Sequence, residues 1–229
     1  MKNKQIIITA IFLFICALGN ATFAHGVDGA TKNFLLGNDG PAFIPFLYIG
    51  AKHMLTGYDH LLFLFGVIFF LYRPKEVLVY VSYFTIGHST TLLLGVWFNI
   101  GINAYLIDAI IALSIACKAI DNLGGLKKIF GYQPNTKVAV LIFGLFHGFG
   151  LATKIQDFKL SKDGLFTNLI GFNIGVEIGQ FIALLFVLIL FSFWRYSKSF
   201  MRFSLLTNTL LMAAGFILLG YQLTGYFTS

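Results

Sequence analysis

Six long apolar runs dominate the sequence, and short segments that hold most of the charged residues and prolines separate them. The runs cover roughly residues 44–72, 77–98, 102–122, 138–155, 165–194 and 204–226. A helix needs about 20 apolar residues to cross a bilayer, and the strict alternation of barrel strands is missing. Because lipid gives open sheet edges no hydrogen-bonding partners, the pattern predicts an all-α fold, a polytopic transmembrane helix bundle of about six helices over 44–226.

The N-terminal segment has the pattern of a secretory signal. Two lysines precede an apolar run that ends at Leu18, and small residues lead to Ala24. We expect a signal peptide over 1–24 with cleavage after Ala24, while an uncleaved anchor helix stays open as the alternative. Cleavage makes His25 the N-terminal residue of a short external segment, 25–43.

Composition and charge support a membrane protein and argue against a nucleic-acid partner. Hydrophobic residues make up 58% of the chain and charged residues only 11%, against roughly 25% charged in soluble domains. The net charge of +7 comes from Lys and Arg between the apolar runs rather than from one basic face. We expect the lipid bilayer as a partner and leave a homo-oligomer open.

The distribution of Lys and Arg predicts the orientation. A translocated N-terminus places on the inner side Arg73, Lys75, Lys118, Lys127, Lys128, Lys137, Arg195, Lys198 and Arg202, and on the outer side Lys32, Lys52, Lys154, Lys159 and Lys162. Nine against five agrees with the positive-inside rule. We therefore predict a multi-pass protein of the inner cell membrane with its N-terminus outside.

The apolar runs also contain ionisable residues at overlapping depths. Taking about 1.5 Å of rise per residue, His53, His60, His88, His147 and Glu177 all lie near mid-membrane. Each costs about 2.5–3.5 kcal/mol to insert. One intramembrane His alone is often an interhelical hydrogen-bonding group, and Glu177 alone could be a protonated structural acid. The set, spread over four runs, predicts one shared site.

The residue types of this set suit a divalent transition metal. His53 and His60 are seven residues apart and share one helix face, whereas Asp59 is turned about 100° from His60. Asp59 could be a ligand or hold the second nitrogen of a ligand histidine. Imidazoles and carboxylates together suit Ni, Co, Zn or Cu. The predicted metal-binding residues are His53, Asp59, His60, His88, His147 and Glu177.

Four further residues are predicted to be accessory: His25, Ser89, Asn173 and Gln180. A free N-terminal His25 could capture a metal through its amine and ring. Asn173 and Gln180 share a stripe with Glu177, and Ser89 adjoins His88. A second stripe of glycines four residues apart on the 165–194 run is expected to pack against a neighbouring helix.

The sequence from His53 to His60 resembles the HX5DH signature of the HupE/UreJ proteins, and later blocks at 84–92, 144–152 and 173–180 resemble that family in order. The resemblance extends over 45–225. It implies a secondary metal permease related to members associated with nickel enzymes, with His53, Asp59, His60 and His147 as functional residues. The nickel-permease form of the motif at His147 continues with another His and a Glu, which are absent here.

These observations favour a secondary transporter or facilitator for a divalent transition metal, nickel first and Co, Zn or Cu as alternatives. The chain has no Walker A pattern, so energy would come from ion gradients or the membrane potential. One rival is an intramembrane metal-dependent hydrolase in which Ser89 or Glu177 assists a bound water. Another is a membrane metal sensor or an insertion partner for a metalloenzyme.

Overall fold

A computed structural model describes residues 33–34, 37, 40–156 and 163–228, and the predicted signal peptide and His25 lie outside these ranges. Within them the chain forms eight helices and no strand, which confirms the all-α prediction. The helices are α3 (Phe43–Thr56), α4 (Tyr58–Ile68), α5 (Pro74–Trp97), α6 (Ala104–Asn122), α7 (Gly125–Phe130), α8 (Thr136–Gln156), α9 (Leu165–Arg195) and α10 (Ser199–Thr228).

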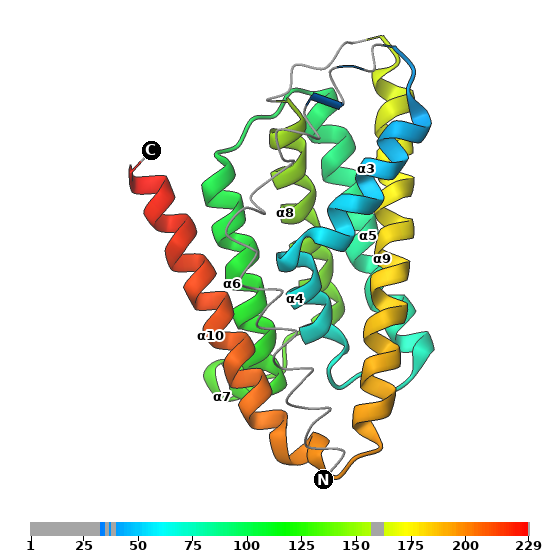
Figure 1. The fold of residues 1–229 in the computed structure, drawn as a ribbon. Helices are drawn as coiled ribbons and strands as arrows, with labels where there is room; N and C mark the ends of the chain where they lie inside the picture. Colours follow the sequence, from blue (N-terminus) through cyan, green and yellow to red (C-terminus); the bar gives the residue numbers. More distant parts are fainter. Residues whose placement is uncertain (1–32, 35–36, 38–39, 157–162, 229) are drawn as a thin grey trace.

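Four of these helices, α5, α8, α9 and α10, are long and apolar enough to cross a membrane. Helix α6 carries three charged residues within its 19 residues, Asp108, Lys118 and Asp121, which reduces its apolar character. It nevertheless runs beside α10 and α8 (Figure 1). The six predicted runs therefore correspond to α3 with α4, and to α5, α6, α8, α9 and α10.

The first run is not the single helix that the sequence predicted. It is divided at Gly57, whose backbone is extended at φ −70° and ψ 102°. One helix ends and the next begins within this one residue. Gly57 N–H donates to the His53 carbonyl at 2.9 Å and closes α3, and Leu61 N–H donates to the Gly57 carbonyl at 3.1 Å and opens α4. A Cβ on Gly57 would collide with the side chains of Asp59 and His60. The break therefore depends on glycine for space rather than for its backbone angles.

Glycines join the helices into close pairs. Helix α9 presents a stripe to the α3 backbone, made of Gly171, Gly175 and Gly179. In α5 and α8, Gly87 meets the backbone of α8 near Leu145, and Gly148 meets the His88 carbonyl. Gly215 of α10 lies against Ala116 of α6. The predicted packing role of the α9 glycines agrees with these contacts.

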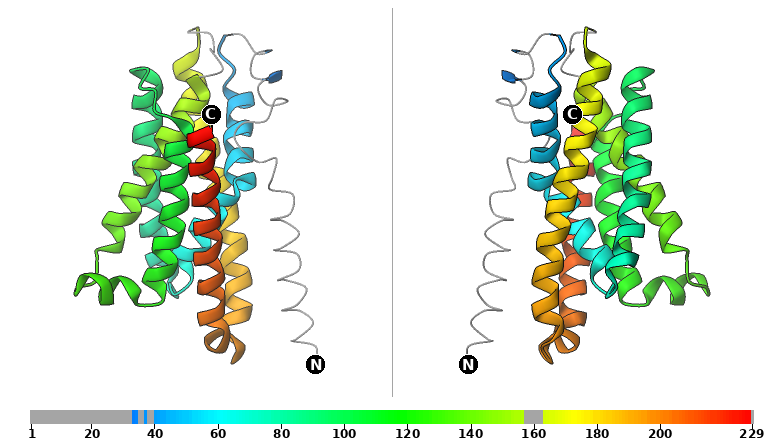
Figure 2. Two further views of the ribbon diagram at one scale, coloured as in Figure 1. Left: turned by 90° about the vertical axis from the view of Figure 1, so that its left-hand side faces the viewer. Right: turned by 90° about the vertical axis from the view of Figure 1, so that its right-hand side faces the viewer.

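The loops gather at two ends of the bundle. Helix α7 and the turn between α9 and α10 lie at one end, while the beginning of α3 and the end of α8 lie at the other (Figure 2). Two apolar clusters fill the interior: one surrounds Phe69 and Phe191, and the other surrounds Phe46 and Phe172. The polar residues of the candidate site lie where these clusters meet, since His53 contacts Phe172 and other histidines contact Phe84 of the first cluster.

Candidate metal site

Four histidine rings meet in the interior of the bundle. The ring centroid of His60 lies 5.0 Å from that of His53, 5.0 Å from that of His147 and 6.4 Å from that of His88. His60, His88 and His147 are buried, and His53 is partly buried. The structure thus brings all four predicted intramembrane histidines together, with His60 at the centre.

The break at Gly57 positions two of these rings. His53 lies in the last turn of α3, and His60 lies in the first turn of α4. The seven-residue spacing predicted that they share one face of a continuous helix. In the structure they are instead neighbours across a helix break. The C-terminal end of α3 carries a partial negative charge that favours a cation, and the N-terminal end of α4 favours the carboxylate of Asp59.

His88 and His147 are positioned by the close packing of α5 on α8. The missing side chain of Gly148, next to His147, lets α8 approach the His88 carbonyl and the Thr91 hydroxyl. Thr91 Oγ1 donates to the Leu145 carbonyl of α8 at 2.7 Å. This contact fixes the relative height of the two helices and therefore of their rings.

The cluster contains buried ring nitrogens that have no hydrogen-bond partner within the described residues. They are Nε2 of His53, both nitrogens of His88, and Nε2 of His60 and His147. The great majority of buried polar groups in proteins are hydrogen-bonded. Five nitrogens in one cluster that lack a partner among the described residues are therefore unusual, and a ligand that binds to them would explain why they are buried there.

At His60 and His147 the contact of one ring nitrogen determines the protonation of the other. His60 Nδ1 lies 2.9 Å from Asp59 Oδ1, and His147 Nδ1 lies 2.8 Å from the Phe143 carbonyl oxygen. Both partners are acceptors, so in a neutral ring each Nδ1 carries the proton and each Nε2 keeps its lone pair. These are the tautomers that a metal-binding Nε2 requires.

Asp59 supports His60 in a second way, because its Oδ1 also accepts a hydrogen bond from the His60 backbone N–H at 3.0 Å. Of the two roles that the sequence left open for Asp59, the geometry matches that of an outer partner of a ligand histidine.

Glu177 is not brought into the cluster. Its side chain is exposed on α9, because the glycine stripe must face α3 and Glu177 is about 200° around the helix from Gly175 and Gly179. The accessory residues beside it join α9 to α5: Ser89 Oγ donates to Asn173 Oδ1 at 3.1 Å, and Thr85 Oγ1 donates to Gln180 Oε1 at 2.9 Å.

A sequence model of the HupE / UreJ protein family matches residues 30–229, nearly the whole chain. The chain belongs to the HupE/UreJ family. The resemblance seen from His53 to His60 is thereby confirmed. HupE/UreJ proteins are membrane proteins that are generally associated with nickel and cobalt transport, and the family is one of transporters rather than enzymes. No curated protein and no solved structure matched.

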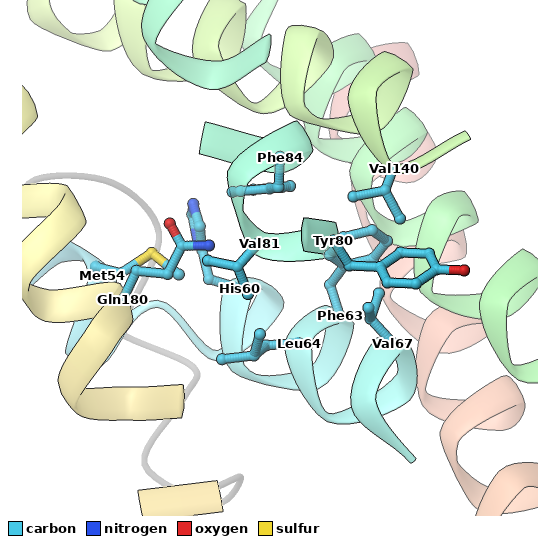
Figure 3. Close-up of a pocket in the computed structure, with 10 residues that line it drawn as sticks. All are labelled: Met54, His60, Phe63, Leu64, Val67, Tyr80, Val81, Phe84, Val140 and Gln180. Atoms are coloured by element: carbon cyan, nitrogen blue, oxygen red, sulfur yellow. The ribbon is translucent and has the colours of Figure 1, made fainter. Parts of the chain in front are cut away.

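A small cavity continues from the histidine cluster of this HupE/UreJ protein. It has a volume of about 10 Å³, roughly enough for one water molecule. His60, Met54 and Gln180 lie together at one side of it, and Tyr80 and Val140 lie at the other (Figure 3). The residues that line it therefore extend from His60 to Tyr80, which lies in the second turn of α5.

Met54 is a cavity residue that the sequence reasoning missed. It is 1% exposed, follows His53 directly and lines the cavity together with His60. One methionine in an apolar run gives no signal of its own, and only its adjacency to His53 could have singled it out.

The imidazoles of this HupE/UreJ chain are gathered but do not surround a common point. Their planes cross at 69–79° in the contacts that His60 makes with the other three. Across the described ranges, no group of three or more His, Cys, Asp or Glu side chains is arranged to hold a metal ion. Binding one ion through several of these rings therefore requires side-chain rotation.

Proposed function

We propose that this HupE/UreJ protein is a secondary transporter or facilitator that carries a divalent transition metal ion inward through the four-histidine cluster. Nickel is the first candidate substrate, with cobalt, zinc and copper as alternatives. The observation that carries the proposal is the set of five buried ring nitrogens that have no hydrogen-bond partner in the described part of the chain. Imidazole suits all four of these metals, whereas magnesium and calcium prefer oxygen ligands.

His60 is the transfer point in this mechanism. Its ring adjoins His53 on one side and His147 and His88 on the other, so an ion can exchange one imidazole ligand for the next without leaving the cluster. The thioether of Met54 in the adjoining cavity adds a soft ligand on the way out. The imidazoles must rotate before several of them can bind one ion. Such a site suits a transporter, because the ion also has to be released from it.

The orientation in the inner membrane is part of the proposal. Helix α7, with Lys127 and Lys128, belongs to the end that the positive-inside rule places in the cytoplasm. The cavity below His60 points toward that end, and the beginning of α3 lies on the outer side. An inside-negative potential then draws the cation in the same direction.

One contact and one exposed position weigh against the hydrolase alternative. The Ser89 hydroxyl donates to Asn173, and Glu177 is exposed on α9, so the first group is already hydrogen-bonded and the second lies outside the cluster. The family assignment also favours transport.

The test is metal uptake by the purified full-length protein in proteoliposomes that contain a metal-sensing dye, with Ni, Co, Zn and Cu in competition. We expect His60→Ala and His147→Ala each to lower the initial rate by at least about 100-fold, since each removes a ligand or its transfer partner. Asp121→Ala, at the opposite end of α6 from the cluster, should keep the rate within about threefold.

Two results would contradict the proposal. Wild-type uptake in both histidine variants is incompatible with the cluster as the site. Tight stoichiometric zinc binding by the wild-type protein without flux of any of the four metals would favour the hydrolase, and reversible binding without flux would favour a metal sensor or insertion partner.

A further inference from the structure

An ion pair lies near the outer end of the bundle, between α8 and α6. Lys154 Nζ lies 3.1 Å and 3.0 Å from the two carboxylate oxygens of Asp108. The side chains are 22% and 13% exposed, respectively. Lys154 is two residues from the end of α8, and Asp108 lies in the second turn of α6. The pair is therefore mostly buried but still accessible to solvent near the end of α8.

The pair lies directly above the histidine cluster. Lys154 follows His147 by seven residues, so both lie on nearly the same face of α8, about 10 Å apart along the helix. The Lys154 ammonium interacts electrostatically with His53, Asp59 and His147. One positive charge of the protein thus already occupies the outer approach to a site proposed to bind cations.

Asp108 is held close to the same approach by packing. Gly150 lies between His147 and Lys154 along α8, and its missing side chain makes room for Ile107, the neighbour of Asp108 on α6. Tyr58, at the start of α4, interacts electrostatically with both Asp59 and Asp108. Asp108 therefore lies close enough to the first turn of α4 to interact with Tyr58 there.

We propose that Asp108 is the ligand of an outer capture site for the divalent ion and that the Lys154 ammonium occupies the cation position until the ion arrives. The inference rests on the proposed transport function and adds its first step. A doubly charged ion attracts the carboxylate more strongly than the ammonium does. Lys154, on a flexible four-carbon stem, then swings toward the outer solvent and the ion passes to the histidines.

The same exchange resets the capture site. Once the ion has moved to the imidazoles, Asp108 is free to pair again with Lys154. The re-formed pair leaves no free carboxylate at the outer approach, so an ion leaving the imidazoles would have to displace Lys154 again to bind there. Without Lys154, Asp108 would have no competing cation to take the place of the bound ion.

A second ion pair provides a matched control. Lys118 Nζ lies 2.7 Å from Asp121 Oδ2 on α6, with side chains 12% and 10% exposed. It has the same chemistry and similar burial, but it lies at the inner end of the same helix. An effect that is due only to losing an ion pair should appear at both ends.

The experiment measures KM and maximal rate of Ni²⁺ uptake by the full-length protein in proteoliposomes, for Lys154→Met, Asp108→Asn, Asp108→Glu and the double variant Asp108→Asn with Lys154→Met. We expect Lys154→Met to lower KM by about tenfold and Asp108→Asn to raise it by at least about tenfold. Asp108→Glu should stay within about threefold of wild type. Lys118→Met should leave KM unchanged.

The double variant separates a ligand from a neutralising partner. If Asp108 binds the ion, the double variant keeps a KM at least about tenfold above that of Lys154→Met. Equal KM values in these two variants would overturn the assignment, because Asp108 would then serve only to neutralise Lys154. Wild-type uptake with the same KM in all variants would overturn the capture site alone. Wild-type vesicles without metal-dependent uptake would overturn the transport function together with it.

Discussion

At His60, one carboxylate decides which ring nitrogen faces the cluster. The Asp59 Oδ1 atom lies 2.9 Å from Nδ1, and Nε2 is buried with no hydrogen-bond partner among residues 40–156 and 163–228. A carboxylate in this position fixes the ring orientation and raises the basicity of the opposite nitrogen. Asp59 would therefore act on the ion through His60 rather than by direct contact.

This relation predicts a graded series at Asp59. Asp59→Ala should weaken Ni²⁺ binding to the purified protein by about 10–100-fold. The Ni²⁺ affinity of Asp59→Asn should lie between those of wild type and Asp59→Ala, because its amide oxygen still accepts a hydrogen bond from Nδ1 but carries no negative charge. Isothermal titration calorimetry measures the affinities, with Asp121→Asn as the control. Equal affinities for wild type and Asp59→Ala would contradict the supporting role.

The histidines could be found from the sequence because ionisable residues within apolar runs are rare and costly. Glu177 satisfied the same rule but lies on the exposed face of α9. Periodicity gives the angle between Glu177 and the glycine stripe, but it does not say which neighbour the stripe will meet. The cavity position of Met54 depends on the same tertiary information.

At the scale of elements, the division between α3 and α4 is the feature that the apolar pattern could not predict. Glycine is common in membrane helices, and the backbone angles of Gly57 are open to any residue. At this position the Asp59 and His60 side chains lie close over Gly57 and leave no room for a Cβ atom. Discontinuous helices at mid-membrane are a recurrent way to build ion sites in transporters.

The contact over Gly57 predicts the effect of one added methyl group. Gly57→Ala would place a Cβ against His60 Nδ1 and Asp59 Oδ1, and should lower Ni²⁺ affinity by about tenfold by displacing the bond between them. Gly220→Ala, on α10 where a Cβ meets nothing within 4 Å, should be harmless or slightly stabilising. The measurement is Ni²⁺ binding together with the thermal unfolding midpoint of each variant. Unchanged affinity in Gly57→Ala would show that the break tolerates a side chain.

The whole molecule is a set of close helix pairs with the histidines between them. Helices α3 and α9 form one pair, and α5 and α8 form another. The two pairs are joined by the hydrogen bonds of Thr85 with Gln180 and of Ser89 with Asn173. The sequence predicted six apolar segments and a packing stripe, but the choice of partners depends on contacts between residues far apart in the sequence, such as Thr91 with Leu145 at 54 positions and Thr85 with Gln180 at 95.

This arrangement places the histidine cluster in the interior of the helix bundle, and under the proposed function the charge of the ion must move through the transmembrane field to reach it. For two charges crossing half of a 100 mV potential, the field contributes about 2.3 kcal/mol. A potassium diffusion potential that makes proteoliposomes negative inside should therefore raise the initial rate of Ni²⁺ uptake by at least about tenfold over vesicles at zero potential. Empty vesicles and His60→Ala vesicles control for leakage. A rate that does not depend on the potential but increases with an imposed pH difference would instead mean that each ion is exchanged for two protons, since that exchange moves no net charge. The buried imidazoles would then be the candidate carriers of those protons.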